Sequence, residues 1–439
     1  MRLQPSRASG IGPRANLAAF HMPPLRIHPA NPRYFQDAAG RAVYLTGSHH
    51  WDNLIDNAER PGGFDFECYL DRLQSWGHNF IRLWSHEAWT HDLHPRPYLR
   101  SGNRFDLTRF DPEYFARLRQ RVSRAGERGF HVSVMLFNGW SIHDKGEGNP
   151  WERHPFNRRN NVNGIDGDPD ARGDGADVHT LRIPAITRLQ EAYATKVVET
   201  AGDLDHVLWE ISNESPGASR DWQYHFISHL RSLDANRHPI GMTACFPGNR
   251  NEDLFRGPAD WVSPGNKGGW RRDPPAADGS KIVLVDTDHL WGIGGGRDWV
   301  WKTFLRGHHP IYMDSLDADP QREKARRAMG DTLQFAKRID LAACVPDTKV
   351  CSSGYGLIDR TPGEEEILAY LPRGKARMDL SWIAGTLRAE WFDPARGTST
   401  DGGLIEGGGT RRLVSPWRKE SVLLLKAVSA APEPIRRTS

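Results

Sequence analysis

The 439-residue chain is poor in cysteine, with four residues and no CxxC pair. This scarcity argues against a disulfide framework and against a cysteine-ligated zinc site, and it predicts free thiols that are mostly buried. No apolar run approaches the ~18 residues that a membrane-spanning helix needs, so we expect no membrane partner. The 58 basic and 55 acidic residues nearly balance. That balance argues against a nucleic-acid partner, which normally requires a basic surface.

The two ends of the chain lack the features of folded or targeting segments. Residues 1–30 contain Arg, Pro, Ser and Gly but no apolar core of a secretory signal, so we expect a poorly ordered lead-in and a cytoplasmic location. Residues 431–439 are expected to form a disordered tail. Between them, a chain with 38% hydrophobic and 26% charged residues can form one large and one smaller domain. The sequence predicts no particular oligomeric state.

Eight short apolar segments recur along the first three quarters of the chain, and amphipathic segments separate them. The eight are 42–51, 80–89, 131–140, 207–214, 239–245, 261–266, 282–289 and 310–316. In the intervening segments, such as 111–129 and 184–202, apolar residues recur at three and four positions, which is the period of a helix. Strands that alternate with helices predict an α/β fold, a parallel (β/α)8 barrel over residues 31–342. The weakest predicted strands are the fifth and sixth, 239–245 and 261–266, and the second of these is short and contains a proline.

After residue 345 the pattern changes to short alternating runs between Gly, Pro and Asp turns. The runs are 350–356, 366–372, 386–394, 412–416 and 421–428. Alternation with a period of two is typical of antiparallel strands. We therefore predict that a small all-β sandwich domain over residues 343–430 follows the barrel.

Polar and aromatic residues gather at the ends of the predicted barrel strands, where barrel enzymes form their active sites. A single polar residue at a strand end is explained by exposure of the strand end to water. Here, however, carboxylates, histidines and tryptophans converge on one face. Indole rings are suitable platforms for sugars, and Trp291 is the best single candidate. The predicted substrate-binding residues are Asn213, Arg82, His50, Trp84, His86, Asn138, Trp140, His289, Trp291 and Asp314.

The run 208-LWEISNES-215 ends the apolar fourth strand in an Asn-Glu pair. Here the chain resembles the clan A, cellulase-like glycoside hydrolases, which have (β/α)8 barrels with Asn-Glu at this place. The resemblance implies that Glu214 is the acid/base, that Asn213 binds the sugar 2-hydroxyl, and that Arg82 supports the nucleophile. It also implies an oligosaccharide or polysaccharide substrate. The segments 390-EWFDPARG-397 and 421-SVLLLK-426 resemble a C-terminal β-domain of some of these barrels, which is sometimes labelled collagen-binding.

The seventh strand departs from that family, which ends it in a Glu nucleophile. The run 282-IVLVDTDH-289 contains Asp286 and Asp288, and in an extended strand both face the barrel interior. We choose Asp288 as the nucleophile because it lies level with Glu214 if the strand is regular to its end. A strand that stops early favours Asp286 instead. We expect a retaining enzyme, which requires a carboxyl separation of ~5–5.5 Å rather than ~6.5–9.5 Å.

The two carboxyls need different protonation states, because one donates a proton and the other attacks the anomeric carbon. We expect an apolar, tryptophan-lined mouth to raise the pKa of Glu214, and Arg82 to lower the pKa of Asp288. No cofactor is expected.

Other residue clusters leave alternatives open. The long loop 141–183 is predicted to be a substrate lid in which Asn157, Arg158 and Asn160 reach sugar hydroxyls; calcium binding by its aspartates is less favoured, because the bidentate Glu of such loops is missing. The adjacent His49 and His50 point to opposite faces of a strand, so only one enters the pocket. We expect hydrogen bonding to sugar there, and no metal. The alternative functions are a non-catalytic carbohydrate-binding barrel and a metal-dependent barrel hydrolase that uses histidines and Asp314.

Overall fold

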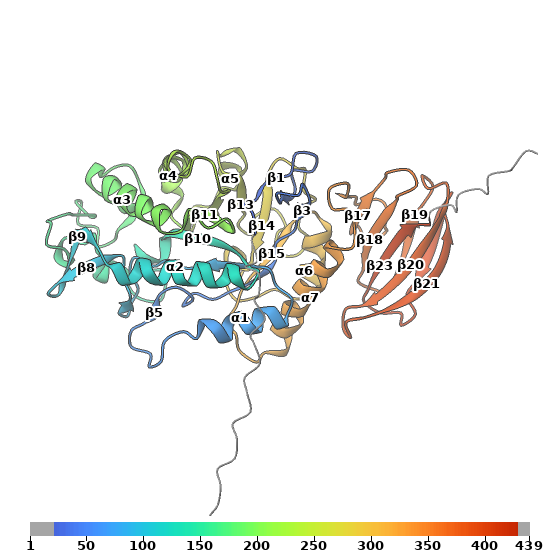
Figure 1. Ribbon diagram of the computed structural model, residues 1–439, viewed down its shortest axis with the longest axis horizontal. Coiled ribbons are helices and arrows are strands. Elements are labelled where there is room, and N and C mark those ends of the chain that lie inside the picture. Colours follow the sequence, from blue (N-terminus) through green and yellow to red (C-terminus); the bar gives the residue numbers. More distant parts are fainter. Residues whose placement is uncertain (1–21, 429–439) are drawn as a thin grey trace, which may run out of the picture.

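The computed structural model describes residues 22–428, so the expected 431–439 tail and most of the expected lead-in lie outside the described residues. Eight parallel strands form a barrel (Figure 1). They are β4 (Gly47–His49), β6 (Phe80–Leu83), β10 (His131–Asn138), β11 (Val207–Asn213), β12 (Ile240–Thr243), β13 (Trp261–Ser263), β14 (Ile282–Asp286) and β15 (His309–Met313). They pair in the order β4-β15-β14-β13-β12-β11-β10-β6. The ring closes next to β4 and β6, where Asn79 N donates to Thr46 O at 3.1 Å. The predicted barrel is confirmed.

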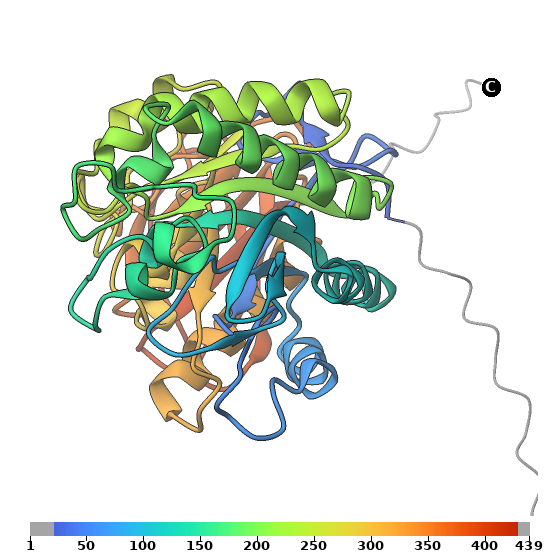
Figure 2. The same ribbon diagram turned by 90° about the vertical axis from the view of Figure 1, so that its left-hand side faces the viewer.

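Within the described residues, seven α-helices surround the strands, and Figure 2 shows α1 in blue and α2 in teal on one side of the barrel. They are α1 (Phe66–Ser75), α2 (Pro112–Glu127), α3 (Pro184–Ala201), α4 (Arg220–Leu233), α5 (Asn251–Arg256), α6 (Arg297–Leu305) and α7 (Pro320–Ala336). Side chains of Asp65, Asp111 and Asp319 accept backbone N–H groups at the starts of α1, α2 and α7. These caps complement the helix dipole and fix where each helix begins. All residues of β10 and β11 are buried, as expected for strands covered on both faces.

A three-stranded sheet of β1 (Arg26–Ile27), β2 (Phe35–Gln36) and β3 (Ala42–Val43) precedes the barrel. Part of the expected lead-in therefore contributes to the fold, because Leu25 is 1% exposed and packs in one cluster with Phe35 and Phe80. Two further strand pairs, β5 (Asp56–Asn57) with β7 (Leu93–His94) and β8 (Tyr98–Ser101) with β9 (Arg104–Phe110), lie in the loop regions after β4 and β6.

The C-terminal region forms two antiparallel sheets and confirms the β-sandwich. The larger sheet contains β16 (Val345–Pro346), β17 (Gly356–Asp359), β18 (Glu366–Leu371), β20 (Thr386–Asp393), β21 (Thr398–Glu406) and β23 (Ser421–Ala427), and the smaller contains β19 (Lys375–Asp379) and β22 (Thr410–Val414). The sequence patterns missed β19 and β21, and the predicted strand 350–356 is displaced to β17. Alternate residues of β18 bury on opposite faces: Tyr370 packs in the barrel cluster and Ile367 in the sandwich cluster.

The sandwich packs on the barrel beside α6 and α7 (Figure 1). Phe392 of β20 lies 6.0 Å from Trp301 of α6 and 5.2 Å from Phe335 of α7, measured between ring centroids. Within residues 22–428, no helix is long and apolar enough to cross a bilayer. All four cysteines are free thiols; Cys68 is exposed, and Cys245, Cys344 and Cys351 are buried.

Candidate active site

A cavity of about 660 Å³ lies where loops follow the barrel strands. This volume is within the usual range for small-molecule sites, roughly 300–1,000 Å³. Five tryptophans line it, Trp51, Trp84, Trp89, Trp140 and Trp291, and four carboxyl side chains, Asp52, Glu147, Glu214 and Asp288. The residue Glu214 is 9% exposed. The side chain of Asp288 is 6% exposed. Two nearly buried carboxyls thus share a cavity rich in aromatic surface.

Glu214 follows β11 directly and has a backbone φ of +44°, in the left-handed region that residues other than glycine rarely adopt. Its carboxylate accepts a hydrogen bond from Trp140 Nε1 at 2.5 Å. Lys145 Nζ donates to the Glu214 backbone carbonyl at 2.8 Å and lies 3.9 Å from Oε2. Burial raises the pKa of Glu214, although Lys145 and Trp140 oppose the shift. The direction is the one expected from the sequence.

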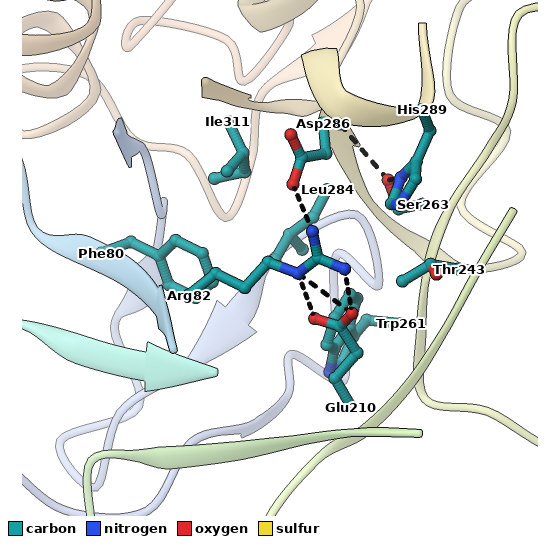
Figure 3. A pocket seen from close by; sticks show the side chains of 10 residues that line it. All are labelled: Phe80, Arg82, Glu210, Thr243, Trp261, Ser263, Leu284, Asp286, His289 and Ile311. Atoms are coloured by element: carbon teal, nitrogen blue, oxygen red, sulfur yellow. Dashed lines mark hydrogen bonds and ion pairs between the residues drawn. The ribbon is translucent and has the colours of Figure 1, made fainter. Parts of the chain in front are cut away.

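The end of the seventh strand differs from the extended geometry expected from the sequence. β14 stops at Asp286, and Thr287–His289 form a 3-10 turn, η6. The Asp286 side chain accepts a hydrogen bond from Asp288 N at 3.0 Å and so caps this turn. Asp288 borders the large cavity, whereas Asp286 borders a separate void of about 10 Å³, whose lining residues Figure 3 shows. The early stop therefore does not bring Asp286 to the cavity, because the turn carries Asp288 there instead.

Asp286 is held beneath the cavity by His49. Trp84 Nε1 donates to His49 Nδ1 at 2.8 Å, and His49 Nε2 on the other side of the ring donates to Asp286 at 2.8 Å. Burial alone would raise the pKa of Asp286, but His49 and Arg82 outweigh burial and hold it below its ordinary value. Asp286 is therefore an ionised, fully engaged group.

Asp288 has the opposite shift. Burial and the neighbouring charge of Glu214 raise its pKa well above the ordinary value, and Arg82, at 3.0 Å, does not offset them. Arg82 acts to lower this pKa, as expected, but the net shift is upward, because burial and like-charge repulsion are the stronger effects. Two neighbouring carboxyls with raised pKa values titrate as a pair and tend to hold one proton between them.

Below the cavity, the Arg82 guanidinium lies between the carboxylates of Asp286 and Glu210 (Figure 3). Its Nε donates to both oxygens of Glu210 at 2.9 and 3.0 Å. Nη2 donates to Asn213 Oδ1 and Nη1 to Asp288 Oδ2, each at 3.0 Å. Glu210 lies in the middle of β11, away from the strand ends where the sequence pattern places site residues. Its signal was a charge inside the apolar run 207-VLWEIS-212, since a buried charge needs a partner.

Replacing Glu210 with Gln should lower the free energy of unfolding by about 3 kcal/mol, because a buried guanidinium loses its bidentate partner. Chemical denaturation followed by circular dichroism measures this. Glu390→Gln, which breaks the exposed pair with Arg338, is the matched control and should cost less than about 1 kcal/mol. Equal effects of the two substitutions would contradict the role of Glu210.

The predicted substrate-binding residues fall into three groups. Trp84, His86, Trp140, His289 and Trp291 line the cavity as expected. Arg82, Asn138 and Asn213 do not line it; they form the buried layer below. Asn213 Oδ1 is bonded to His289 Nε2 at 3.1 Å, and Asn138 Nδ2 donates to His86 Nδ1 at 2.9 Å. These three position the residues above them rather than border the cavity.

His50 and Asp314, the third group, are corrections. His50 stacks on Trp51 at 4.1 Å and is not a cavity residue, so the histidine directed into the barrel is His49. Asp314 is fully buried and accepts from Arg326 Nε of α7 at 2.8 Å. The carboxylate at this strand end forms an ion pair with an arginine of a helix. The local sequence pattern does not reveal this pairing.

The loop 141–183 packs in a small hydrophobic cluster with residues of β8 and β9, and most of it does not border the cavity. Trp151 and Phe156 pack there with Val178. Only Lys145 and Glu147 from this loop line the large cavity. The expected donors Asn157, Arg158 and Asn160 do not line it, and Asn157 and Asn160 bond within the loop.

The aspartates of this loop are engaged by protein groups. Asp170 accepts from Arg182, and Asp168 from loop N–H groups. In the part of the chain that the structure describes, no group of three or more His, Cys, Asp or Glu is arranged to hold a metal ion. The sequence also missed Arg60, Phe246 and Arg271 as cavity residues, because each lies on a loop outside the strand ends.

Comparisons with known proteins agree with this architecture. Residues 29–163, less than half of the chain, match the family model described as "Apiosidase-like, catalytic domain". A solved structure described as a glycoside hydrolase is similar at 12% identity with a TM-score of 0.61, over 93% of this chain and 98% of that one.

A glycoside hydrolase family 5 protein from Bacteroides vulgatus is similar at 14% identity with a TM-score of 0.58, over 93% and 96% of the two chains. At these identities the likeness concerns the fold. No curated protein matches the chain.

Proposed function

We propose that this chain is a retaining glycoside hydrolase acting on an oligosaccharide or polysaccharide, with Glu214 as acid/base and Asp288 as nucleophile. One observation carries the proposal: two buried, electrostatically coupled carboxyls border one cavity that five tryptophans line. Glycosidic cleavage needs one carboxylic acid and one carboxylate at the same centre. Indole faces suit the C–H surfaces of a sugar ring. The partial match to an apiosidase-like family adds support.

In the first step, an Asp288 carboxylate oxygen bonds to the anomeric carbon while the glycosidic C–O bond breaks. Glu214 transfers its proton to the departing oxygen, so the leaving group departs as a neutral alcohol. In the second step, the Glu214 carboxylate takes a proton from water, the water oxygen attacks the anomeric carbon, and Asp288 is released. Two inversions give net retention.

The surrounding residues suit this division of roles. Trp140 Nε1 holds the Glu214 carboxyl in place, and Arg82 Nη1 orients one oxygen of Asp288 and leaves the other for attack. Asp286 and Glu210 balance the charge of Arg82 from below. The buried layer therefore fixes the geometry of the pair without bordering the cavity.

A panel of aryl glycosides, including furanosides and an apioside, tests the proposal. Wild-type protein should release the aryl alcohol from at least one of them, and a metal chelator should have no effect. Activity that a chelator abolishes would favour a metal-dependent hydrolase. Binding of sugars without turnover of any glycoside would favour a non-catalytic carbohydrate-binding barrel.

The pH profile of kcat/KM should be bell-shaped. When both carboxyls are protonated, no carboxylate can attack, and when both are ionised, no proton donor remains. Both limbs should lie above the ordinary carboxyl pKa values of about 4. Lys145→Met should move the alkaline limb upward by about 1 pH unit, because the ammonium favours the ionised form of Glu214. Burial lowers the pKa of Lys145 to about 8, so its influence is confined to lower pH.

The control for this shift is Lys349→Met, an exposed lysine of the sandwich. It should leave the profile unchanged. An alkaline limb that stays in place or moves downward in Lys145→Met would contradict the electrostatic role of Lys145.

A further inference from the structure

A second cavity, of about 620 Å³, lies where α6 meets the sandwich, and it shares no lining residue with the active-site cavity. Its lining contains five cationic side chains and no Asp or Glu. The five are Lys302, Arg373, Lys375, Arg377 and Arg412, and together they define the basic groove. A concave surface with charge of one sign concentrates oppositely charged ligands.

The strand register places three of these cations, Lys375, Arg377 and Arg412, on one face. Lys375 and Arg377 alternate on β19 with Ala376 and Met378, which are buried in the sandwich core. Arg412 of β22 is the register partner of Arg377. Like charges directly opposite on antiparallel strands destabilise a sheet. The sandwich therefore maintains a local repulsion that packing does not require.

Neighbouring carboxylates do not neutralise the groove. Within residues 22–428, Arg373, Lys375, Arg377 and Arg412 have no ion pair. Lys302 alone is paired, with Asp298 at 3.0 Å. Other arginines of the sandwich do have partners: Arg360 pairs with Asp347 and Arg388 with Asp401. Four exposed cations are thus left for a ligand.

The barrel side of the groove is fixed to the sandwich. Tyr355 Oη donates to Asp273 at 3.1 Å, and Arg306 of the barrel donates to the same carboxylate oxygen at 3.0 Å. The Arg306 guanidinium also lies 4.9 Å from the Tyr355 ring centroid. These contacts preform the groove, so a ligand need not order it on binding.

We propose that the basic groove binds a carboxylated polysaccharide and holds it on the enzyme; this rests on the proposed glycosidase function. Uronate-type carboxylates pair with arginine guanidinium groups by two parallel hydrogen bonds. Single-stranded nucleic acid is disfavoured because its binding sites present aromatic rings on which bases stack. The groove has one aromatic ring, Tyr355, which cations already approach. A tethered chain would raise the effective concentration of its glycosidic bonds at the active site.

Affinity electrophoresis tests the groove with the full chain carrying Glu214→Gln, so that no polymer is cleaved. Carboxymethyl cellulose should retard the protein, and the retardation should weaken with salt, whereas hydroxyethyl cellulose should not retard it. Adding Arg377→Gln with Arg412→Gln should weaken binding at least tenfold. Arg109→Gln with Arg188→Gln, two exposed arginines of the barrel, removes the same charge and should leave binding unchanged.

Equal binding of both celluloses, or binding that survives the Arg377 and Arg412 substitutions, would overturn the proposal. Tighter binding of single-stranded DNA than of carboxymethyl cellulose would assign the groove to nucleic acid instead. In an otherwise wild-type background, the double substitution should leave kcat and KM on small aryl glycosides unchanged and keep the thermal midpoint. Loss of polymer binding with intact aryl glycosidase activity separates this proposal from the catalytic one.

Discussion

Glu214→Gln is expected to reduce kcat/KM on glycosides with poor leaving groups by about 10³-fold, because general acid catalysis contributes roughly 10²–10⁴. Activated aryl glycosides should lose far less in the first step, since their leaving groups depart without a proton. Initial rates on a series of aryl glycosides with graded leaving-group pKa values measure this. The slope against leaving-group pKa should become steeper in the variant.

Glu147→Gln is the matched control, because Glu147 is a second glutamate lining the same cavity. It should affect good and poor leaving groups alike and preserve the slope of the wild-type protein. A Glu214→Gln variant with an unchanged slope would show that the proton comes from another group.

Asp288→Asn should abolish turnover of activated and unactivated substrates alike, by about 10⁴-fold, because no carboxylate remains to attack the anomeric carbon. Added azide should restore part of the activity by attacking in place of the carboxylate. Asp286→Asn removes a buried partner of His49 and Arg82. It should reduce activity by a smaller factor that azide does not restore. Rescue of Asp286→Asn alone would exchange the two roles.

The same two substitutions should change the thermal midpoint of unfolding in opposite directions. The folded-state pKa of Asp286 is lowered, so its contribution to stability is present at neutral pH and is lost as the pH falls. Asp286→Asn should therefore lower the thermal midpoint at pH 7. The folded-state pKa of Asp288 is raised, so its ionised form is unfavourable at neutral pH and Asp288→Asn should raise the midpoint. Thermal midpoints that move in the same direction in both variants would contradict these assignments.

The barrel was predictable because strand and helix periods alternate regularly along the sequence. Even β13, which with β4 is one of the two shortest strands of the barrel, has three buried residues before Pro264. The sandwich was predictable as a class but not strand by strand. Strand β21 has seven glycine or polar residues among nine, TSTDGGLIE, and no buried residue, so no alternating apolar pattern marks it.

The candidate site was predictable where strand ends alone determine position, as for Glu214. The site was not predictable at positions where a side-chain hydrogen bond determines the backbone conformation. The Asp-Thr-Asp-His run is compatible with an extended strand, and the turn depends on Asp286 accepting the N–H of Asp288. Strand alternation separates His49 from His50 but does not say which faces inward, because the register of β4 against β15 decides it.

Trapping the covalent intermediate tests the assignment of the Glu214–Asp288 pair most directly. A 2-deoxy-2-fluoro glycoside of the sugar identified by the panel slows breakdown of a glycosyl-enzyme, and peptide mass spectrometry then locates the label. We predict one adduct, on Asp288, with retained configuration in the normal product. An adduct on Asp286, or a product of inverted configuration without any adduct, would contradict the account.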